Sequence, residues 1–282
     1  TATATASPSA SPPVPEPPPP VAAPREHLKT NAGLGITTAS DTPVWAQRAL
    51  KKLEADLTKE RDPLRVGRLH FEIARLYESP LGELVSAADH YQKAYATCPD
   101  HVPTLRGARR VLCAKKSFHA ALPLFDAEAR YLSEPTLKAQ LLYEKGRILE
   151  DHLAQKREAR DAYAAAVELD GQNASYLKAL ERVDTQAKAW DALDKTLERS
   201  ANAVSGDTRH RAALLVERAR LVEARKGDSR TATELYNEAL GFDPRAPAAL
   251  EALKRLHYAH QRWRDLTFVL QREAEQAGDA TV

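Results

Sequence analysis

The sequence predicts an all-α chain built from repeated helical hairpins, and three observations support this. When the sequence is shifted against itself so that Phe71 falls on Tyr143, and then Tyr143 on Val216, three long windows coincide. Each window divides into halves of about 34 residues, the length of two short antiparallel helices with their turns. Between Pro43 and the C-terminus, no segment shows the apolar–polar alternation of a strand. Together they predict hairpins that bury their apolar faces against one another.

The first 41 residues differ in composition from the rest. Half of the 18 prolines fall between Pro8 and Pro24, among alanine, serine and threonine. Such a segment has little apolar surface to bury, and its prolines stiffen it. The sequence therefore predicts a disordered linker over residues 1–41. Asp41 and Pro43 suit the start of a helix, which predicts a lead-in or capping helix over residues 42–60 and the repeat array over residues 61–282.

Each long window is one repeat unit, and the units match one another best in two short helical segments, called here the first and the second window. In the first window, FEIARLYE begins at Phe71, YEKGRILE at Tyr143 and VERARLVE at Val216. A small residue recurs inside this window, and an Ala-x3-Tyr-x2-Ala pattern recurs in the second window. The recurring small residues and tyrosines are Ala74, Gly146 and Ala219, then Tyr91, Tyr163 and Tyr236. Small residues allow two helices to approach closely, so the tyrosines are expected to be buried between hairpins.

Each repeat unit divides into two half-units. One of them fits the repeat pattern well and is called strong here, and the other departs from it and is called weak. The spacing between successive anchor positions alternates between about 34 residues and four or five more. The anchors are Tyr91, Phe125, Tyr163, Leu197, Tyr236 and Leu270. The half-units between the strong ones depart from the pattern, because an aromatic residue opens their second helix. These aromatic residues are Phe118, Trp190 and Trp263.

This pattern resembles the tetratricopeptide repeat (TPR), and in particular large bacterial arrays in which strong and degenerate repeats alternate. The resemblance covers about residues 43 to 276. It implies a right-handed α-solenoid of about six TPR-like hairpins. The hairpins form three double units of about 72–73 residues each. They are expected to turn near Gly82, Ser117, Ala154, Lys188, Gly227 and Gln261.

Neither the composition nor the motifs indicate catalysis, nucleic-acid binding or membrane insertion. The 41 basic and 39 acidic residues nearly cancel, leaving a net charge of +2, so no global field attracts nucleic acid. No apolar run reaches the roughly 20 residues of a membrane helix. No glycine-rich phosphate loop, nucleophile elbow or pair of catalytic carboxylates appears. We therefore expect no enzyme activity, no cofactor, no nucleic-acid partner and no membrane insertion.

Cysteine and histidine residues offer only superficial metal motifs. Cys98 and Cys113 are separated by most of one predicted helix, too far to share a zinc ion or a disulfide. We interpret them as ordinary thiols. His257 and His260 are interpreted as ordinary surface or boundary histidines, since the aligned positions hold no histidine.

The TPR resemblance implies that the first helix of each hairpin lines a concave groove. On a helical wheel the groove positions form one stripe, opposite a predicted buried set that includes Leu69 and Leu76. The candidate peptide-binding residues are Arg68, Phe71, Arg75, Glu78, Gln140, Tyr143, Arg147, Glu150, Val216, Arg220 and Glu223.

Two interpretations of this stripe stay open. An arginine recurring in each unit could bind carboxylates bidentately, with Phe71 and Tyr143 as apolar anchors. Alternatively, Arg75 lies three residues from both Glu72 and Glu78, so the stripe could hold only local ion pairs. The carboxylate clamp of chaperone-binding TPR proteins is not matched, so a chaperone-tail partner is not supported.

The sequence therefore favours a non-catalytic scaffold that binds an unidentified peptide or protein through the groove. The alternative is a structural spacer within a larger envelope-associated or kinase-linked protein, with no groove ligand. Trp263, Leu266 and Leu270 are expected to lack cover on one flank, which predicts either further repeats or end-to-end self-association. The compartment is left open, with a cytoplasmic location favoured over a bacterial envelope.

Overall fold

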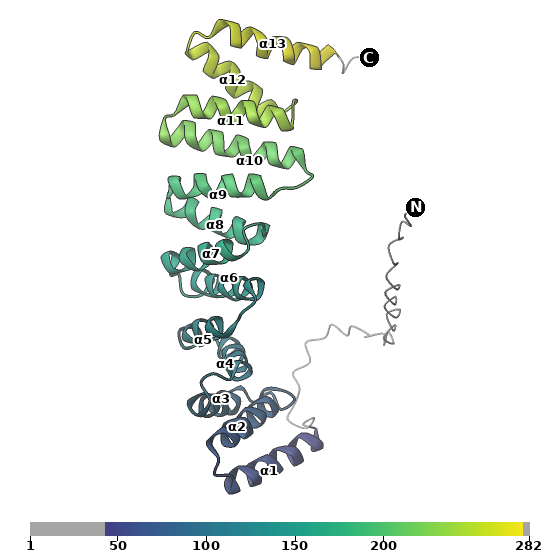
Figure 1. Ribbon diagram of the computed structural model, residues 1–282, viewed down its shortest axis with the longest axis vertical. Helices are drawn as coiled ribbons and strands as arrows, with labels where there is room; N and C mark the ends of the chain where they lie inside the picture. The colour runs from purple at the N-terminus through teal and green to yellow at the C-terminus, as the bar shows by residue number, and fades with distance from the viewer. Residues whose placement is uncertain (1–42, 279–282) are drawn as a thin grey trace, which may run out of the picture. The chain divides into compact units, whose positions relative to one another are not determined.

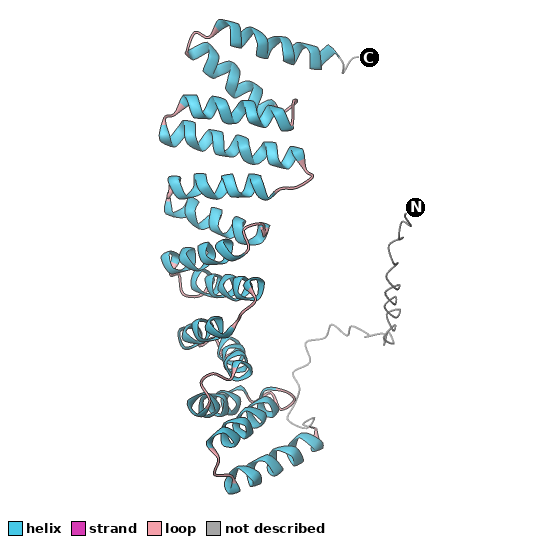
Figure 2. Cartoon of the chain, in the orientation of Figure 1, coloured by secondary structure: helices cyan, strands magenta, loops and turns pink. Residues whose placement is uncertain are grey.

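The computed structural model describes residues 43–278, and its secondary structure in this range is entirely helical (Figures 1 and 2). The predicted linker over residues 1–41 lies outside the described range. The helices are α1 (Val44–Lys59), α2 (Pro63–Glu78), α3 (Leu84–Thr97), α4 (Val102–Ala114), α5 (Phe118–Tyr131), α6 (Pro135–Asp151), α7 (Lys156–Leu169), α8 (Ala174–Ala187), α9 (Trp190–Ala203), α10 (Thr208–Leu221), α11 (Ser229–Phe242), α12 (Pro247–Ala259) and α13 (Trp263–Gly278), with a short π-helix, η1 (Val222–Lys226), continuing α10.

The helices from α2 onward form six hairpins, each of which packs on the next. Within hairpins, α2 contacts α3, α4 contacts α5, and the pattern continues to α12 and α13. Between hairpins, α3 contacts α4, α5 contacts α6, and so on, while α1 contacts α2. Figure 1 shows the helices following one another in chain order. The predicted all-α fold is confirmed as a helical solenoid of the TPR type.

Every hairpin turn contains one residue with a left-handed backbone conformation. Such a residue reverses the chain directly after a helix, as in many helix C-caps. The six residues are Gly82, Lys116, Ala154, Lys188, Gly227 and Gln261, with φ between 55° and 72°. Five are the predicted turn residues, and the sixth precedes the predicted Ser117 by one residue.

Helix starts follow local sequence signals. The Asp62 carboxylate accepts a hydrogen bond from the Leu64 amide at 3.2 Å, which caps α2, and Asp228 caps α11 in the same way. Proline occupies the first turn of α2, α4, α6 and α12, where its missing N–H has no helical partner to lose. The lead-in helix begins at Val44, after Pro43 in the N-cap position.

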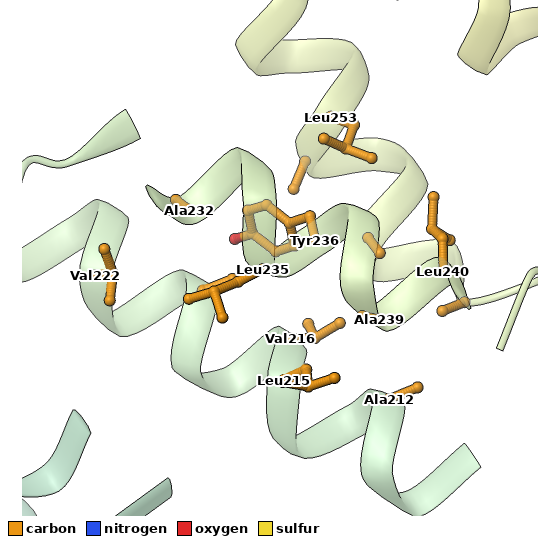
Figure 3. Packing of buried hydrophobic residues seen from close by; sticks show 14 of the residues in the cluster. Ala212, Leu215, Val216, Val222, Ala232, Leu235, Tyr236, Ala239, Leu240 and Leu253 are labelled. Atoms are coloured by element: carbon orange, nitrogen blue, oxygen red, sulfur yellow. The ribbon is translucent and has the colours of Figure 1, made fainter. Parts of the chain in front are cut away.

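The three repeated tyrosines are fully buried, as predicted: Tyr91, Tyr163 and Tyr236 each expose 0% of their surface. Figure 3 shows Tyr236 among Val216 of α10, its neighbours on α11 and Leu253 of α12. The small residues opposite make room for the rings. A Cβ added at Gly146 would lie 2.6 Å from Cε1 of Tyr163, closer than real side chains approach.

The predicted buried face of α2 is partly wrong. Leu69 and Leu76 are only half-buried, whereas Gly67, Ile73 and Ala74 are buried. The reason is that α2 contacts both α1 and α3, and most extensively α3. A helical wheel predicts one buried stripe, and it does not show which residues face α1 and which face α3.

Replacing Tyr163 by Ala should lower the free energy of unfolding by about 3 kcal/mol, because a buried aromatic ring leaves a cavity. Replacing it by Phe keeps the ring and removes only the hydroxyl, which should cost about 1 kcal/mol. Urea denaturation followed by circular dichroism measures both values. Equal, small effects of the two changes would contradict the interior role of the ring.

Candidate functional site

A glutamate at the end of α2 is held by side chains from two further helices. Tyr91 of α3 donates its hydroxyl to Oε2 of Glu78 at 2.7 Å. Arg110 of α4 pairs with both oxygens of the same carboxylate, with Nη2 2.7 Å from Oε2. This triad therefore joins both helices of one hairpin to the first helix of the next.

The same triad recurs once in each of the other two double units. Tyr163 donates to Glu150 at 2.9 Å, and Arg182 binds that carboxylate through Nε at 2.9 Å and Nη2 at 2.6 Å. In the third unit, the corresponding distances are 3.2 Å from the Tyr236 hydroxyl to Glu223, and 2.7 and 2.9 Å from Arg255 to its two oxygens.

The triads fix the protonation states of their members at neutral pH. Hydrogen bonds from Arg182 and Tyr163 hold the pKa of Glu150 below its ordinary value, against the opposing effect of burial. Burial and the hydrogen bond to Glu150 raise the pKa of Tyr163. Burial and the charge of Glu223 raise the pKa of Tyr236 to about 12. Tyr163 is therefore a neutral donor to the Glu150 anion.

The three arginines predicted for the groove are exposed. Arg75 and Arg147 have 59% and 61% of their side chains accessible. Nη1 of Arg75 lies 3.4 Å from Glu72, and Nε of Arg147 lies 3.7 Å from Asp151. Both pairs are local contacts on one helix, worth a few tenths of a kcal/mol. Arg220 is also exposed and forms no ion pair within residues 43–278.

The predicted apolar positions lie deeper than the arginines. Phe71 and Tyr143 are half-buried, with ring centroids 4.9 Å from His101 and from Tyr176 respectively. Both rings therefore contact the start of the following first helix. Val216 is buried, with 5% exposure, in the large cluster around α10 to α12. Its side chain packs in the core and does not reach the surface.

The two remaining candidates lie in separate pockets. Arg68 is exposed and lines a pocket with Asp56 and Lys59 of α1. Gln140 is exposed and lines a pocket between α4 and α6, next to Arg106. The structure thus distributes the predicted residues over alternate first helices, α2, α6 and α10 with η1, and does not gather them in one cavity.

The arginines of the triads are not among the residues predicted from the sequence. Arg110, Arg182 and Arg255 keep 60%, 52% and 61% of their side chains exposed while they pair with the glutamates. Every first helix from α2 to α12 therefore carries at least one exposed arginine. We call this set the arginine ladder: Arg75, Arg110, Arg147, Arg182, Arg220 and Arg255.

Neighbouring arginines of the ladder act on the same carboxylate or line the same pocket. Although burial opposes the shift, hydrogen bonds from Arg110 and Tyr91 and the charge of Arg75 lower the pKa of Glu78. Arg110 and Arg147 line one pocket between α4 and α6.

The signal for the missed arginines is present in the sequence, because each of them follows a triad glutamate by 32 residues.

The pocket shared by Arg110 and Arg147 has a volume of about 480 Å³ and is lined by four arginines, by Glu144 and Asp151, and by the apolar side chains of Phe125 and Ile148. Arg109 lies with its guanidinium 4.6 Å from the centre of the Phe125 ring. It also bridges two carboxylates, at 2.9 Å from Glu128 and 2.9 Å from Glu144. These contacts hold the pocket wall in place.

Within residues 43–278, no group of three or more metal-ligating side chains converges, and no helix is long and apolar enough to cross a membrane. Cys98 and Cys113 are free thiols, and burial raises the pKa of Cys113. The surface or boundary interpretation of His257 is wrong, since it is buried with 5% exposure. It aligns with Asp184, another buried position of a first helix. His260 is exposed.

Replacing Glu150 by Gln should destabilise the protein by about 2 kcal/mol at neutral pH, because the hydrogen bonds to a charged group are lost. The pKa of Glu150 in the folded chain lies below its ordinary value of 4.5. The stabilisation is therefore present above that ordinary value and is lost as the pH falls through the folded pKa. Urea denaturation across acidic pH should show a weaker acid dependence in the variant. Parallel pH profiles would contradict this role.

The chain was compared with known proteins. No protein-family model and no curated protein sequence matches it. A chain of the Naa15/Naa10 complex bound to HypK-THB is 13% identical and has a TM-score of 0.53. That alignment covers 83% of this chain and 35% of the other, so this chain spans about a third of its length.

Two further solved structures are similar at lower TM-scores. YrrB, described as a TPR protein with an unusual peptide-binding site, is 20% identical over 75% of this chain and 98% of that chain, with a TM-score of 0.42. MamA from Desulfovibrio magneticus RS-1 is 18% identical over 59% and 95%, with a TM-score of 0.37. At these levels of sequence identity, the similarity supports a statement about the fold alone. The chain resembles TPR-repeat proteins, and its fold is the helical solenoid of that type.

Proposed function

We propose that this chain is a non-catalytic scaffold that binds an acidic segment of a partner protein through the arginine ladder. One observation carries the proposal: each of the six consecutive first helices presents an exposed arginine. An extended acidic segment would meet a guanidinium on each helix it crosses. Guanidinium groups bind carboxylates through two parallel hydrogen bonds, so the ladder suits such a segment.

The triad glutamates serve this site as positioning residues. Glu78, Glu150 and Glu223 expose only 13%, 11% and 16% of their side chains. Each orients one arginine while hiding most of its own charge from solvent. The oriented arginines lose less side-chain entropy when a ligand binds. The other three ladder arginines, Arg75, Arg147 and Arg220, form no hydrogen bond or ion pair with a triad glutamate.

Apolar contacts belong to the same proposal. The apolar side chains of Phe125 and Ile148 line the same pocket as two ladder arginines, Arg110 and Arg147. Phe71 and Tyr143 are half-buried near other ladder positions, and Arg68 and Gln140 extend the polar set. The ligand that fits these features is an acidic segment that also carries apolar side chains. The Naa15/Naa10 complex, one chain of which has a similar fold, is bound to HypK-THB.

A spacer without a groove ligand is the second candidate. It is favoured by the pairing of Arg75 with Glu72 and of Arg147 with Asp151, which offsets part of the ladder charge. In a spacer these arginines would only solvate the surface. The two functions differ in whether removal of the ladder charge changes binding of an acidic ligand.

Binding of a labelled oligoglutamate peptide with a central leucine, measured by fluorescence anisotropy, tests the proposal. A variant with Arg75, Arg147 and Arg220 all changed to Ala should bind at least about tenfold more weakly, since each lost charged contact is worth about 1 kcal/mol. Binding to the unmodified chain should weaken as salt is added, because the contacts are exposed.

The matched control changes Arg130, Arg157 and Arg230 to Ala. These three exposed arginines lie on the second helices α5, α7 and α11, so the net charge changes equally while the ladder stays intact. This control should bind the peptide like the unmodified chain. Equal losses in both variants would reduce the effect to net charge, and no binding to any of the three chains would favour the spacer.

A further inference from the structure

A pocket of about 490 Å³ lies where α3 meets α4 and α5, and we call it the α3–α5 pocket. Its lining includes the buried ring of Tyr91 and five further side chains that belong to, or pack against, the same core cluster as Tyr91. These are Ala88 and Tyr95 of α3, Ala108 and Leu112 of α4, and Leu124 of α5. Val85, which is 72% exposed, extends the apolar lining to the surface. The volume and the mainly apolar lining are typical of a site for a small molecule.

The second double unit fills the corresponding space with its own side chains. Arg160 aligns with Ala88, and Asp184 aligns with Leu112. Nε of Arg160 lies 2.5 Å from Oδ1 of Asp184, so the arginine side chain reaches from α7 to α8. In the first double unit, an alanine and a leucine stand at these two positions and leave the space open.

The apolar character of the pocket belongs to the first double unit and not to the repeat as such. Val85 aligns with Arg157 and Arg230, both of which are exposed. In the third double unit, the positions of the alanine and the leucine hold Thr233 and His257, and both are buried. Of the three double units, only the first has apolar side chains at all three positions.

Two residues that line the pocket carry polar groups without a partner. Lys115 and Tyr95 are half-buried, and their side chains form no hydrogen bond or ion pair within residues 43–278. Asp89 also lines the pocket, but Lys93 offsets its charge at 2.7 Å. The pocket therefore offers one free ammonium and one free hydroxyl beside apolar walls. A carboxylate accepts hydrogen bonds from both kinds of group.

We propose that the α3–α5 pocket binds a small carboxylic acid that carries an apolar chain or ring. The apolar part packs against Ala88, Leu112 and Leu124, and the carboxylate accepts hydrogen bonds from Lys115 and Tyr95. Such a ligand contacts two successive hairpins at once, so its binding stabilises their interface.

The pocket is separate from the arginine ladder. Ala108, Leu112 and Lys115 follow one another on α4 and its C-cap at spacings of four and three residues, which places them on one face. Arg110, the ladder arginine of α4, lies about 160° around the helix from Leu112. A ligand in the pocket therefore leaves the ladder free.

Isothermal titration calorimetry with the whole chain and three probes that share an eight-carbon chain tests the proposal. Octanoate should bind at one site with a dissociation constant on the order of 100 µM, the affinity that a ligand of about ten non-hydrogen atoms reaches at moderate efficiency. 1-Octanol lacks the charge and should bind several-fold more weakly. Octylammonium should bind more weakly still, because its charge repels the ammonium of Lys115.

Two lysine variants separate the proposed contact from net charge. Lys115→Ala introduces the residue of the aligned Ala187. It should weaken octanoate binding about tenfold, since a charged hydrogen bond is lost, and leave 1-octanol binding unchanged. The matched control is Lys195→Ala, because Lys195 is exposed on α9, outside the pocket. This control should bind octanoate like the unmodified chain.

A triple variant fills the pocket with the side chains of the second double unit: Ala88→Arg, Leu112→Asp and Leu124→Thr. It copies Arg160, Asp184 and Thr196, whose hydroxyl donates to Asp184. It should bind neither octanoate nor 1-octanol. Its circular dichroism spectrum and melting temperature show whether it folds, and if it does not, the two lysine variants decide the question.

Four results would overturn the proposal. The first is absence of saturable octanoate binding, and the second is an equal loss with Lys115→Ala and Lys195→Ala. The third is octylammonium binding as tight as that of octanoate, because Asp89 would then be the anchor. The fourth is unchanged octanoate binding to a folded triple variant, which would place the site outside the pocket.

Discussion

A tyrosine ring that fills the space between two hairpins carries a hydroxyl group, and a buried hydroxyl without a hydrogen-bond partner is costly. Glu150, which precedes Tyr163 in the chain, meets this requirement by accepting its hydrogen bond. The carboxylate is itself mostly shielded from water, so it needs a cation in turn, and Arg182 supplies one from the next hairpin. The small residue opposite the ring, the glutamate and the exposed arginine thus follow from one buried tyrosine per double unit.

The turns and the buried tyrosines could be predicted from the sequence, whereas the pairing of the triad glutamates with arginines could not. The turns follow from breaks between helical windows, and the buried tyrosines follow from the long repeat that aligns Tyr91 with Tyr163, so both were identified without coordinates. The pairing of Glu78 with Arg110 was missed because it spans 32 residues and depends on how two hairpins are rotated against each other. The same limitation applies to Val216, which a helical wheel placed on the groove stripe although it packs in the core.

The interfaces between consecutive hairpins alternate between two kinds. Where a strong half-unit meets a weak one, as α2 and α3 meet α4, a charged triad joins them around a buried tyrosine. Where a weak half-unit meets a strong one, aliphatic packing is combined with ion pairs, such as Lys145 with Asp126 at 2.6 Å and Arg218 with Asp194 at 2.7 Å. In a solenoid, stability is close to a sum over such neighbouring contacts. Acid weakens the first kind by protonating Glu78 and Glu150, whose pKa values are lowered in the folded chain. It also weakens the α9–α10 interface, where, against burial, Lys226 and Arg218 lower the pKa of Asp194.

The arginine ladder follows the triad interfaces, since three of its members are triad residues, and its ligand contacts are exposed and charged. Added salt should therefore weaken binding there.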